Sequence, residues 1–145
     1  RSDRDWSSDV CSSDLLFCRG DEPLANEMAP RVHNSGHWTS DGAETSQFEN
    51  HLRAVLGLPL GDTRVLGYAC MLNWLGRMPD ARAVLAEPSG HWHDYGKQPR
   101  DGRKVGHANL RDDDAAALAD ALERVGLALA RQAQVEPVVR ALRER

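Results

Sequence analysis

The sequence has few cysteines, no long apolar run and no large excess of one charge. Its 145 residues carry 18 basic and 22 acidic side chains, which gives a formal net charge of −4. This mixed charge lacks the concentrated positive patch that nucleic-acid-binding proteins use. No apolar run approaches the ~18 residues of a membrane span, and no signal-peptide pattern is present. We therefore expect a cytoplasmic globular chain of one-domain length, with no nucleic-acid and no membrane partner.

The small number of cysteines argues against a disulfide-stapled fold. Of the three cysteines, Cys18 and Cys70 lie in apolar, strand-like surroundings. Isolated cysteines in an intracellular chain are more often buried thiols than disulfide partners. We expect both to be buried and free.

The first half of the sequence predicts a β-hairpin, a polar loop and a helix. A Gly/Asp turn separates two strand-like segments. Ser46 and Glu49 form a capping box ahead of apolar residues at helical spacing. The expected elements are the strands Leu16–Arg19 and Pro23–Glu27, the loop 29–44 and the helix Ser46–Leu56.

The second half predicts a small α+β domain with antiparallel strands and a long helix. The run Asp112-Asp113-Asp114 caps that helix, whose apolar residues recur at helical spacing from Leu118 to Leu129. Pro137 suits the first turn of a last short helix. The other expected elements are the strands Arg64–Trp74, His91–Tyr95 and Lys104–Leu110 and the short helix Met78–Ala86.

Residues 26–39 stand out because they gather a carboxylate, a guanidinium, two imidazoles and two carboxamides with few apolar residues. A core strand reads as an apolar run or as an alternation, and this segment does neither cleanly. The composition indicates a segment that holds charged ligands.

Four cations, Lys97, Arg100, Arg103 and Lys104, surround Gly102. Such a charge run is usually a solvated loop, and its alternative role is to bind an anionic group. His91, His93 and His107 lie nearby in sequence. No Cys/His spacing typical of a transition-metal site accompanies them, so we expect no such site.

Residues 26–39 closely resemble the signature of the 5-(carboxyamino)imidazole ribonucleotide synthases, which are ATP-grasp ligases of purine biosynthesis. Later segments resemble further motifs of this family in the same order. The resemblance implies an α+β fold, with the hairpin, loop and helix as the tail of an ATP-grasp domain and a small α+β domain after it. The later segments are Thr45–Gly61, Ala69–Gly76, Tyr95–Lys97 and Arg100–His107.

The resemblance implies that Glu27 and Asn26 hold Mg²⁺ and ATP. Mg²⁺ prefers oxygen ligands and usually lies between carboxylates and nucleotide phosphates. Strict strand alternation would point these two side chains to opposite faces, which favours Glu27 as the ligand. The family spacing places a second Glu at about position 15, where this chain has Leu15.

In the family reaction, ATP phosphorylates bicarbonate, and the resulting carboxyphosphate delivers CO₂ to the amine of 5-aminoimidazole ribonucleotide. The resemblance assigns stabilisation of the reacting anions to Arg31, His33 and Asn34, so that positioning and charge carry catalysis. Ser35 offers a backbone N–H to the substrates. The ribonucleotide is expected to bind at Lys97, Arg103 and Lys104.

We expect three segments: a non-native segment 1–15, the end of an ATP-grasp domain at 16–60 and a small domain at 61–145. Residues 1–15 match nothing in the family, and residues 5–15 can be back-translated into the end of a sequencing-library adapter. The larger part of the expected enzyme is absent, so this chain alone is expected to be inactive and its full-length parent a homodimer.

Two alternatives stay open from the sequence. The parent is a different purine-pathway ATP-grasp enzyme, such as a formate-dependent glycinamide ribonucleotide transformylase, or the chain is a folding or dimerisation module without catalysis. The run Asn34–Trp38 fits the carboxylating synthase better than the transformylase.

Overall fold

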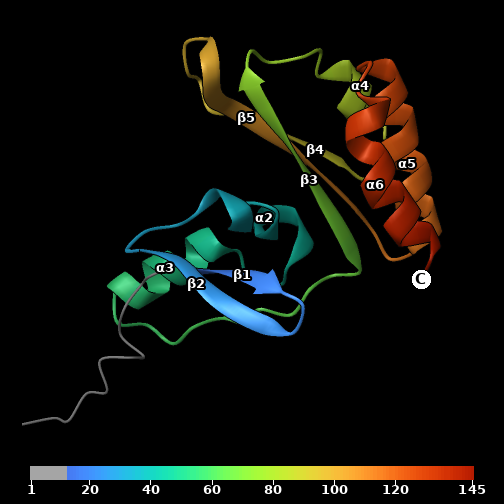
Figure 1. The fold of residues 1–145 in the computed structure, drawn as a ribbon. Helices are drawn as coiled ribbons and strands as arrows, with labels where there is room; N and C mark the ends of the chain where they lie inside the picture. The colour runs from blue at the N-terminus through green and yellow to red at the C-terminus, as the bar shows by residue number, and fades with distance from the viewer. Residues whose placement is uncertain (1–12) are drawn as a thin grey trace, which may run out of the picture. The chain divides into compact units, whose positions relative to one another are not determined.

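The computed structural model describes residues 13–145, except for the side chains of residues 13–16 and of Glu27. The chain divides into two compact units (Figure 1). The first unit comprises the residues up to Ser40 together with Glu44–Arg64, and the second comprises Asp41–Ala43 and Val65–Arg145.

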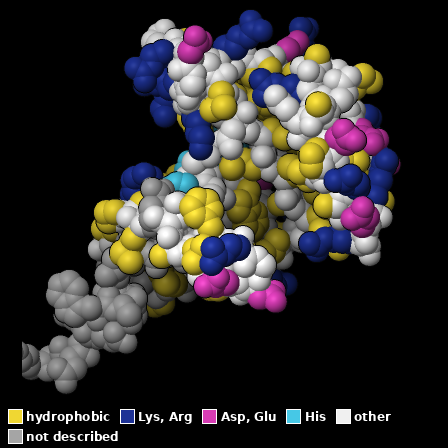
Figure 2. Space-filling model, in the orientation of Figure 1, with side chains coloured by type: hydrophobic (Ala, Val, Ile, Leu, Met, Phe, Trp, Pro, Cys, Tyr) yellow, Lys and Arg dark blue, Asp and Glu magenta, His cyan; other side chains and the backbone are white. Residues whose placement is uncertain are grey.

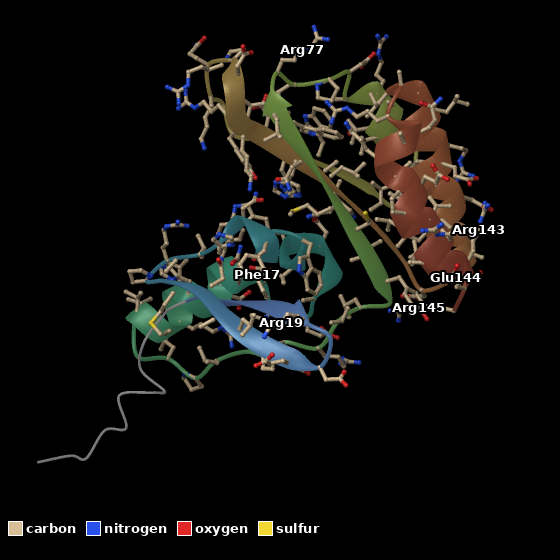
Figure 3. The ribbon with its side chains drawn as sticks, in the orientation of Figure 1. Phe17, Arg19, Arg77, Arg143, Glu144 and Arg145 are labelled. Atoms are coloured by element: carbon tan, nitrogen blue, oxygen red, sulfur yellow. The ribbon has the colours of Figure 1, made fainter. Side chains whose placement is uncertain are left out.

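The first unit begins with the expected β-hairpin. Strands β1 (Ser13–Arg19) and β2 (Glu22–Ala29) pair antiparallel. Gly20 turns the chain with a positive φ of 63°, a conformation that glycine adopts without strain. Arg19 and Glu22 flank the turn and form an ion pair at 2.8 Å. Figure 3 labels Arg19 on the hairpin. Both strands are longer than the sequence pattern predicted.

Three residues of the segment 1–15, which we expected to be non-native and therefore irregular, form regular structure. Ser13, Asp14 and Leu15 extend β1 and pair with Ala29, Met28 and Glu27. Strand pairing uses backbone groups that every non-proline residue carries, so a segment of any origin can continue the ladder. The other residues of this expectation lie outside the described part of the chain.

A β-bulge interrupts the hairpin at Asn26. Leu15 pairs with Glu27 and Leu16 pairs with Ala25, so that β2 has one extra residue at this point. A bulge breaks the alternation of a strand and re-aims side chains. Because of the bulge, Asn26 and Glu27 need not face opposite sides of this hairpin, contrary to what strict alternation predicts.

The predicted loop 29–44 contains two short helical segments, η1 (Asn34–Gly36) and α2 (Thr39–Gly42). Helix α3 (Gln47–Val55) follows, as its pattern predicted. The Ser46 side chain accepts the N–H of Glu49 at 3.1 Å, and the Glu49 carboxylate accepts from Arg53. Ser46 therefore caps the helix as predicted, while the Glu49 side chain bonds to Arg53 on the helix surface.

The second unit is built on a three-stranded antiparallel sheet of order β3-β5-β4. Its strands are β3 (Tyr68–Gly76), β4 (Gly90–Asp94) and β5 (Arg100–Asp112). The predicted strand Arg64–Trp74 starts too early, because Gly67 has a positive φ of 63° that ends extended backbone just before Tyr68. Most residues of β3 are half-buried, because β3 lies at the edge of the sheet.

Helices α5 (Ala115–Ala128) and α6 (Gln132–Arg143) cover one face of this sheet (Figure 1). The Asp114 carboxylate caps α5 by accepting the N–H of Ala116 at 2.9 Å, as predicted. Apolar side chains from the sheet and both helices form a buried core between them. Its members include Trp74, Val105, Ala108, Leu110, Leu118, Leu122, Val125, Val135 and Val139.

Two predicted helices have different bounds. The helix expected over Met78–Ala86 is a single turn, α4 (Arg82–Leu85). The last helix begins at Gln132, so Pro137 lies inside α6 and not in its first turn. The reason is local: Ala130 takes a left-handed φ of 53° and Arg131 donates its N–H to Gly126, which lets the chain restart as a helix at once.

Both thiols are free, but they are less buried than predicted. Cys18 is exposed on the hairpin, and so is the neighbouring Phe17. Cys70 is half-buried against the core, and desolvation raises its pKa to about 11. Within the described residues, no helix is both long and apolar enough to span a membrane.

Candidate functional site

The polar loop of the first unit is organised around His33. This residue caps η1 by accepting the N–H of Ser35 on its Nδ1 atom at 3.2 Å, and its ring nitrogen also lies 2.9 Å from the Ser35 hydroxyl. A ring nitrogen that accepts an N–H carries no proton, so the hydrogen of the neutral ring lies on Nε2. His33 is thereby oriented as a donor through Nε2.

Gln47, the first residue of α3, fixes this loop from the other side. Its amide accepts the N–H of His33 at 3.1 Å and donates to the His33 carbonyl at 2.7 Å. It also contacts the Nδ1 atom of His37. One side chain therefore satisfies both backbone groups of His33, and the sequence pattern did not single it out.

Gly36 lies where the loop meets Gln47. A Cβ atom at position 36 would lie 2.6 Å from the Oε1 atom of Gln47, closer than real Cβ atoms approach. The Thr39 hydroxyl donates to the Gly36 carbonyl at 2.6 Å and accepts the N–H of Gln47 at 2.9 Å. These contacts hold the loop in one conformation.

The remaining predicted residues of the loop lie around this framework. Arg31 is exposed, and its guanidinium donates to the Val32 carbonyl at 3.1 Å. Asn34 is half-buried in η1, and Ser35 is exposed. The structure thus brings His33 and Ser35 into contact and leaves Arg31 at the surface of the same loop.

The predicted metal ligands lie on β2. Asn26 is exposed at the bulge, and the side chain of Glu27 lies outside the described residues. The backbone register places position 15 directly opposite Glu27. Among the described residues, no group of three or more His, Cys, Asp or Glu side chains is arranged to hold a metal ion.

The four predicted cations of the second unit lie where β4 runs into β5. Lys97, Arg100 and Lys104 are exposed and Arg103 is half-buried. Figure 2 shows basic side chains gathered over this end of the sheet, where β5 begins. Arg103 donates to the Gln98 carbonyl at 3.4 Å, which ties the connection between the two strands to β5.

Tyr95 lies beneath this cluster. The Lys97 ammonium lies 5.0 Å from the centre of the Tyr95 ring, within the range of a cation–π contact. The Tyr95 hydroxyl lies 2.7 Å from the Nδ1 atom of His107, a nearly buried residue at the middle of β5. Neither Tyr95 nor His107 was among the residues assigned a role from the sequence.

A second, partly buried contact involves Asp41, which belongs to the second unit. Its carboxylate accepts from the Nε2 atom of His93 at 2.7 Å and from the Asn109 amide at 2.6 Å. His91 lies 3.4 Å from its other oxygen. Burial opposes ionisation of this carboxyl, but these hydrogen bonds and the nearby histidines outweigh that effect and lower its pKa.

One sequence signal could have indicated this arrangement. His91 with His93 and His107 with Asn109 are each two residues apart on a strand, the spacing that places side chains on one face. The structure does bring the three histidines to one sheet face, where they bind Asp41 and Tyr95. Asp41 itself has no local signal.

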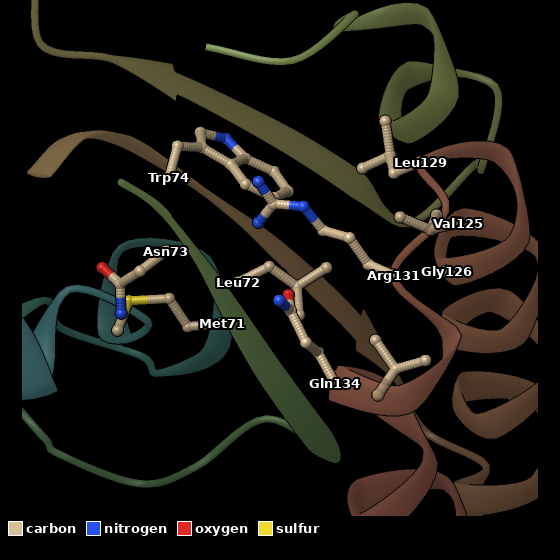
Figure 4. Close-up of a pocket in the computed structure, with 10 residues that line it drawn as sticks. Met71, Leu72, Asn73, Trp74, Val125, Gly126, Leu129, Arg131 and Gln134 are labelled. Carbon is tan, nitrogen blue, oxygen red and sulfur yellow. The ribbon is translucent and has the colours of Figure 1, made fainter. Parts of the chain in front are cut away.

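A pocket of about 110 Å³ lies elsewhere in this unit, between β3 and the two long helices (Figure 4). Arg131 lies over the Trp74 ring there, 5.1 Å from its centre. None of the predicted site residues lines this pocket.

Two family models match the chain. The ATP-grasp domain model matches residues 15–48, and the model described as the phosphoribosylaminoimidazole carboxylase C-terminal domain matches residues 69–121. The first match includes the polar loop and also Asn26 and Glu27 on β2. The second contains Lys97, Arg103 and Lys104.

Individual relatives agree with these matches. The chain is 62% identical over 94 residues to an N5-carboxyaminoimidazole ribonucleotide synthase of Pseudomonas aeruginosa, which covers 65% of this chain and 26% of that protein. A crystal structure of the corresponding synthetase from Thermus thermophilus is 58% identical, with a TM-score of 0.74, over 77% of this chain and 31% of that one.

A third relative was solved with ligands. The synthase of Aspergillus clavatus, in complex with ADP and 5-aminoimidazole ribonucleotide, is 32% identical, with a TM-score of 0.68, over 77% of this chain and 32% of that one. The chain therefore spans only about a quarter to a third of the length of the relatives that it matches.

Proposed function

Because the chain belongs to the family of N5-carboxyaminoimidazole ribonucleotide synthases, we propose that it forms the C-terminal part of an ATP- and bicarbonate-dependent ligase. The ligase carboxylates 5-aminoimidazole ribonucleotide to 5-(carboxyamino)imidazole ribonucleotide. The observation that carries this proposal is the 62% identity over 94 residues to a protein of that name. The complete enzyme acts in the cytoplasm as a homodimer, as the family resemblance implies.

We assign the two units to two domains of that enzyme. The first unit is the end of the ATP-grasp domain, and the second is the small C-terminal domain. The positions of the two family matches, at residues 15–48 and 69–121, support this division.

Mg²⁺ and ATP bind at the hairpin in this proposal. Glu27 and Asn26 supply oxygen ligands of the kind that Mg²⁺ prefers. When bound, the metal neutralises phosphate charge. The bulge at Asn26 supports the assignment, because bulges are over-represented beside active sites, where they re-aim a side chain.

Arg31, His33 and Asn34 stabilise the anion that gains charge during phosphoryl transfer. The guanidinium of Arg31 offers a bidentate fork to an oxyanion, and it lies exposed on the loop. The contacts of His33 with Ser35 and Gln47 support its role, because preorganised donors need no reorganisation as charge develops. Ser35, which lies on the same loop, contacts the substrates in this proposal.

Lys97, Arg103 and Lys104 bind the phosphate of the ribonucleotide. Their charges lie within one short stretch of β5 and its approach, and phosphate binding is the usual role of such a cluster when it is not merely solvated. These residues are far in sequence from the loop that carries Arg31, and they serve binding rather than phosphoryl transfer.

A chimera tests this function. Residues 16–145 replace the corresponding C-terminal segment of the Pseudomonas aeruginosa synthase, and ADP release is followed with and without bicarbonate and the ribonucleotide. We expect ADP release that requires both substrates. A folded chimera that releases no ADP in their presence, or that requires formate and glycinamide ribonucleotide instead, contradicts the proposal.

A further inference from the structure

The sheet of the second unit has two unlike faces. The face toward α5 and α6 carries Trp74, Ala108 and Leu110 of the core. Alternate positions of the same strands carry polar side chains on the other face, where His107 pairs across the ladder with Asn73 on β3 and His93 on β4. Polar residues from all three strands therefore share one face.

His107 lies at the centre of that face and is held on several sides. It is only 3% exposed, and its ring stacks on the His93 ring with centroids 4.3 Å apart and planes 9° from parallel. His93 is in turn bound by the Asp41 carboxylate, which Asn109 also holds. A buried ring fixed in this way is a rigid anchor for whatever binds its other edge.

Tyr95 binds that anchor. Its hydroxyl lies 2.7 Å from the Nδ1 atom of His107, and its backbone N–H donates to the Val105 carbonyl at 3.0 Å. Both the ring and the backbone of Tyr95 are thus attached to β5. Strand β5 therefore fixes the position of the Tyr95 ring.

Lys97 is brought back over the Tyr95 ring by the turn between them. Gly96 has a positive φ of 62°, and its N–H donates to the Asp94 carboxylate at 2.8 Å. The ammonium group then lies 5.0 Å from the ring centre. A lysine side chain has large rotamer entropy, and an aromatic face that attracts its ammonium group restricts that freedom before a ligand arrives.

We propose that Tyr95 and His107 are positioning residues that hold Lys97 for the phosphate of the ribonucleotide substrate. The inference rests on the phosphate-binding role given to Lys97 in the proposed function. Tyr95 and His107 act through Lys97, so their loss weakens substrate binding and leaves phosphoryl transfer unchanged. A preorganised side chain binds its ligand more tightly because less entropy is lost on binding.

The positioning is measurable in the chain itself by NMR. The ε-methylene protons of Lys97 should be shifted upfield by the Tyr95 ring current. Tyr95→Leu should abolish this shift, and Tyr95→Phe should reduce it, because the ring remains but its bond to His107 is lost. Tyr68→Phe removes the other tyrosine hydroxyl of the chain and should leave the shift unchanged. A full shift in Tyr95→Phe overturns the inference.

The consequence for binding is measured in the chimera. Tyr95→Phe should raise the KM for the ribonucleotide roughly three- to tenfold with kcat unchanged, the effect of losing about one hydrogen bond. Combined with Lys97→Ala, it should add nothing further, because Tyr95 acts only through Lys97. Effects of the two changes that multiply, or a lower kcat in Tyr95→Phe, overturn the inference.

Failure of the inference is distinguishable from failure of the proposed function. An active chimera in which Lys97→Ala leaves the KM unchanged contradicts the inference and not the reaction. A chimera that makes no carboxylated ribonucleotide contradicts the reaction, and the NMR measurement then decides whether Tyr95 and His107 hold Lys97.

Discussion

The negatively charged carboxylate of Asp41 lies in a largely enclosed position, with its side chain 13% exposed. Hydrogen bonds from Asn109 and His93 compensate the loss of water, and the pKa of Asp41 falls below its ordinary value of 3.8. A carboxyl whose pKa is lower in the folded state stabilises the fold above the unfolded pKa, and this stabilisation is lost as pH falls through the folded pKa.

Asp41→Asn should therefore destabilise the chain at neutral pH. We expect a loss of about 1.5–3 kcal/mol at pH 7, the typical contribution of hydrogen bonds to a charged group. The difference from the unchanged chain should shrink as pH falls below 3.8. Urea unfolding at pH 7, 5 and 3 measures it, with Asp21→Asn in the exposed hairpin turn as the control. A difference that is the same at all three pH values contradicts this account of Asp41.

Arg31→Ala and Lys97→Ala should fail in different ways in the chimera. Arg31 is assigned to the anion that gains charge in the reaction, so its loss should lower kcat by about 10²–10³-fold. Lys97 is assigned to a phosphate away from the reacting bond, so its loss should mainly raise the KM for the ribonucleotide. Steady-state kinetics separates the two. A near-normal kcat in Arg31→Ala removes that residue from the site.

At the scale of single residues, the sequence revealed caps but not long-range partners. Ser46 and Asp114 were predictable because a cap acts on a backbone N–H two or three residues away. Gln47 bonds to His33 across 14 positions and Asp41 bonds to Asn109 across 68. No local pattern encodes contacts of that separation, since they exist only once the fold has formed.

The hairpin β1–β2 is the element on which metal binding depends. Its register places position 15 opposite Glu27, the relation in which two residues share a face of an antiparallel pair. The family resemblance expects a glutamate at about that position, where this chain has Leu15.

A chimera that begins at residue 15 should bind Mg²⁺ poorly, and Leu15→Glu should restore binding. Because loss of an outer partner of a metal site already costs 10–100-fold in affinity, we expect at least about a tenfold gain from restoring a ligand. Titration of ADP release with Mg²⁺ measures it. Leu16→Glu is the control, since Leu16 pairs with Ala25 across the bulge. Equal gains from both changes would refute the register argument.

The junction of α5 and α6 contains a strained residue. Ala130 has a φ of 53°, and a left-handed conformation costs a residue with a Cβ roughly 1–2 kcal/mol. Ala130→Gly should therefore stabilise the chain by about 0.5–1 kcal/mol, after the greater freedom of glycine in the unfolded chain is subtracted. Ala128→Gly, within α5, should destabilise it by about 1 kcal/mol. Urea midpoints that fall in both variants would contradict the strain at Ala130.

Most element types were predictable, but several boundaries were not: β1 and β2 are longer than predicted, α4 is shorter, and β3 and α6 start elsewhere. The hairpin, α3, β4 and α5 follow turn residues, caps and periodicity. The starts of β3 and α6 depend on Gly67 and Ala130, whose left-handed backbone conformations have no unambiguous sequence signal. Pro137 indicated a helix start, but α6 tolerates it in its interior, where it lacks the N–H for one helical bond.

For the whole molecule, the predicted α+β class and the predicted family are both confirmed. The order of the motifs along the chain predicted the family. Composition and charge only excluded other classes of protein. The roles of individual residues follow from the resemblance and stay predictions, because chemistry depends on ligands that the fold alone does not define.

The most direct test of the central claim is the product formed from labelled bicarbonate. The chimera is incubated with ¹³C-bicarbonate, ATP and 5-aminoimidazole ribonucleotide, and ¹³C NMR follows the label, with this chain alone as the control. We predict a carbamate carbon on the exocyclic amine of the ribonucleotide in the chimera and none with the chain alone. ATP consumption by a folded chimera without label in the ribonucleotide would contradict the account.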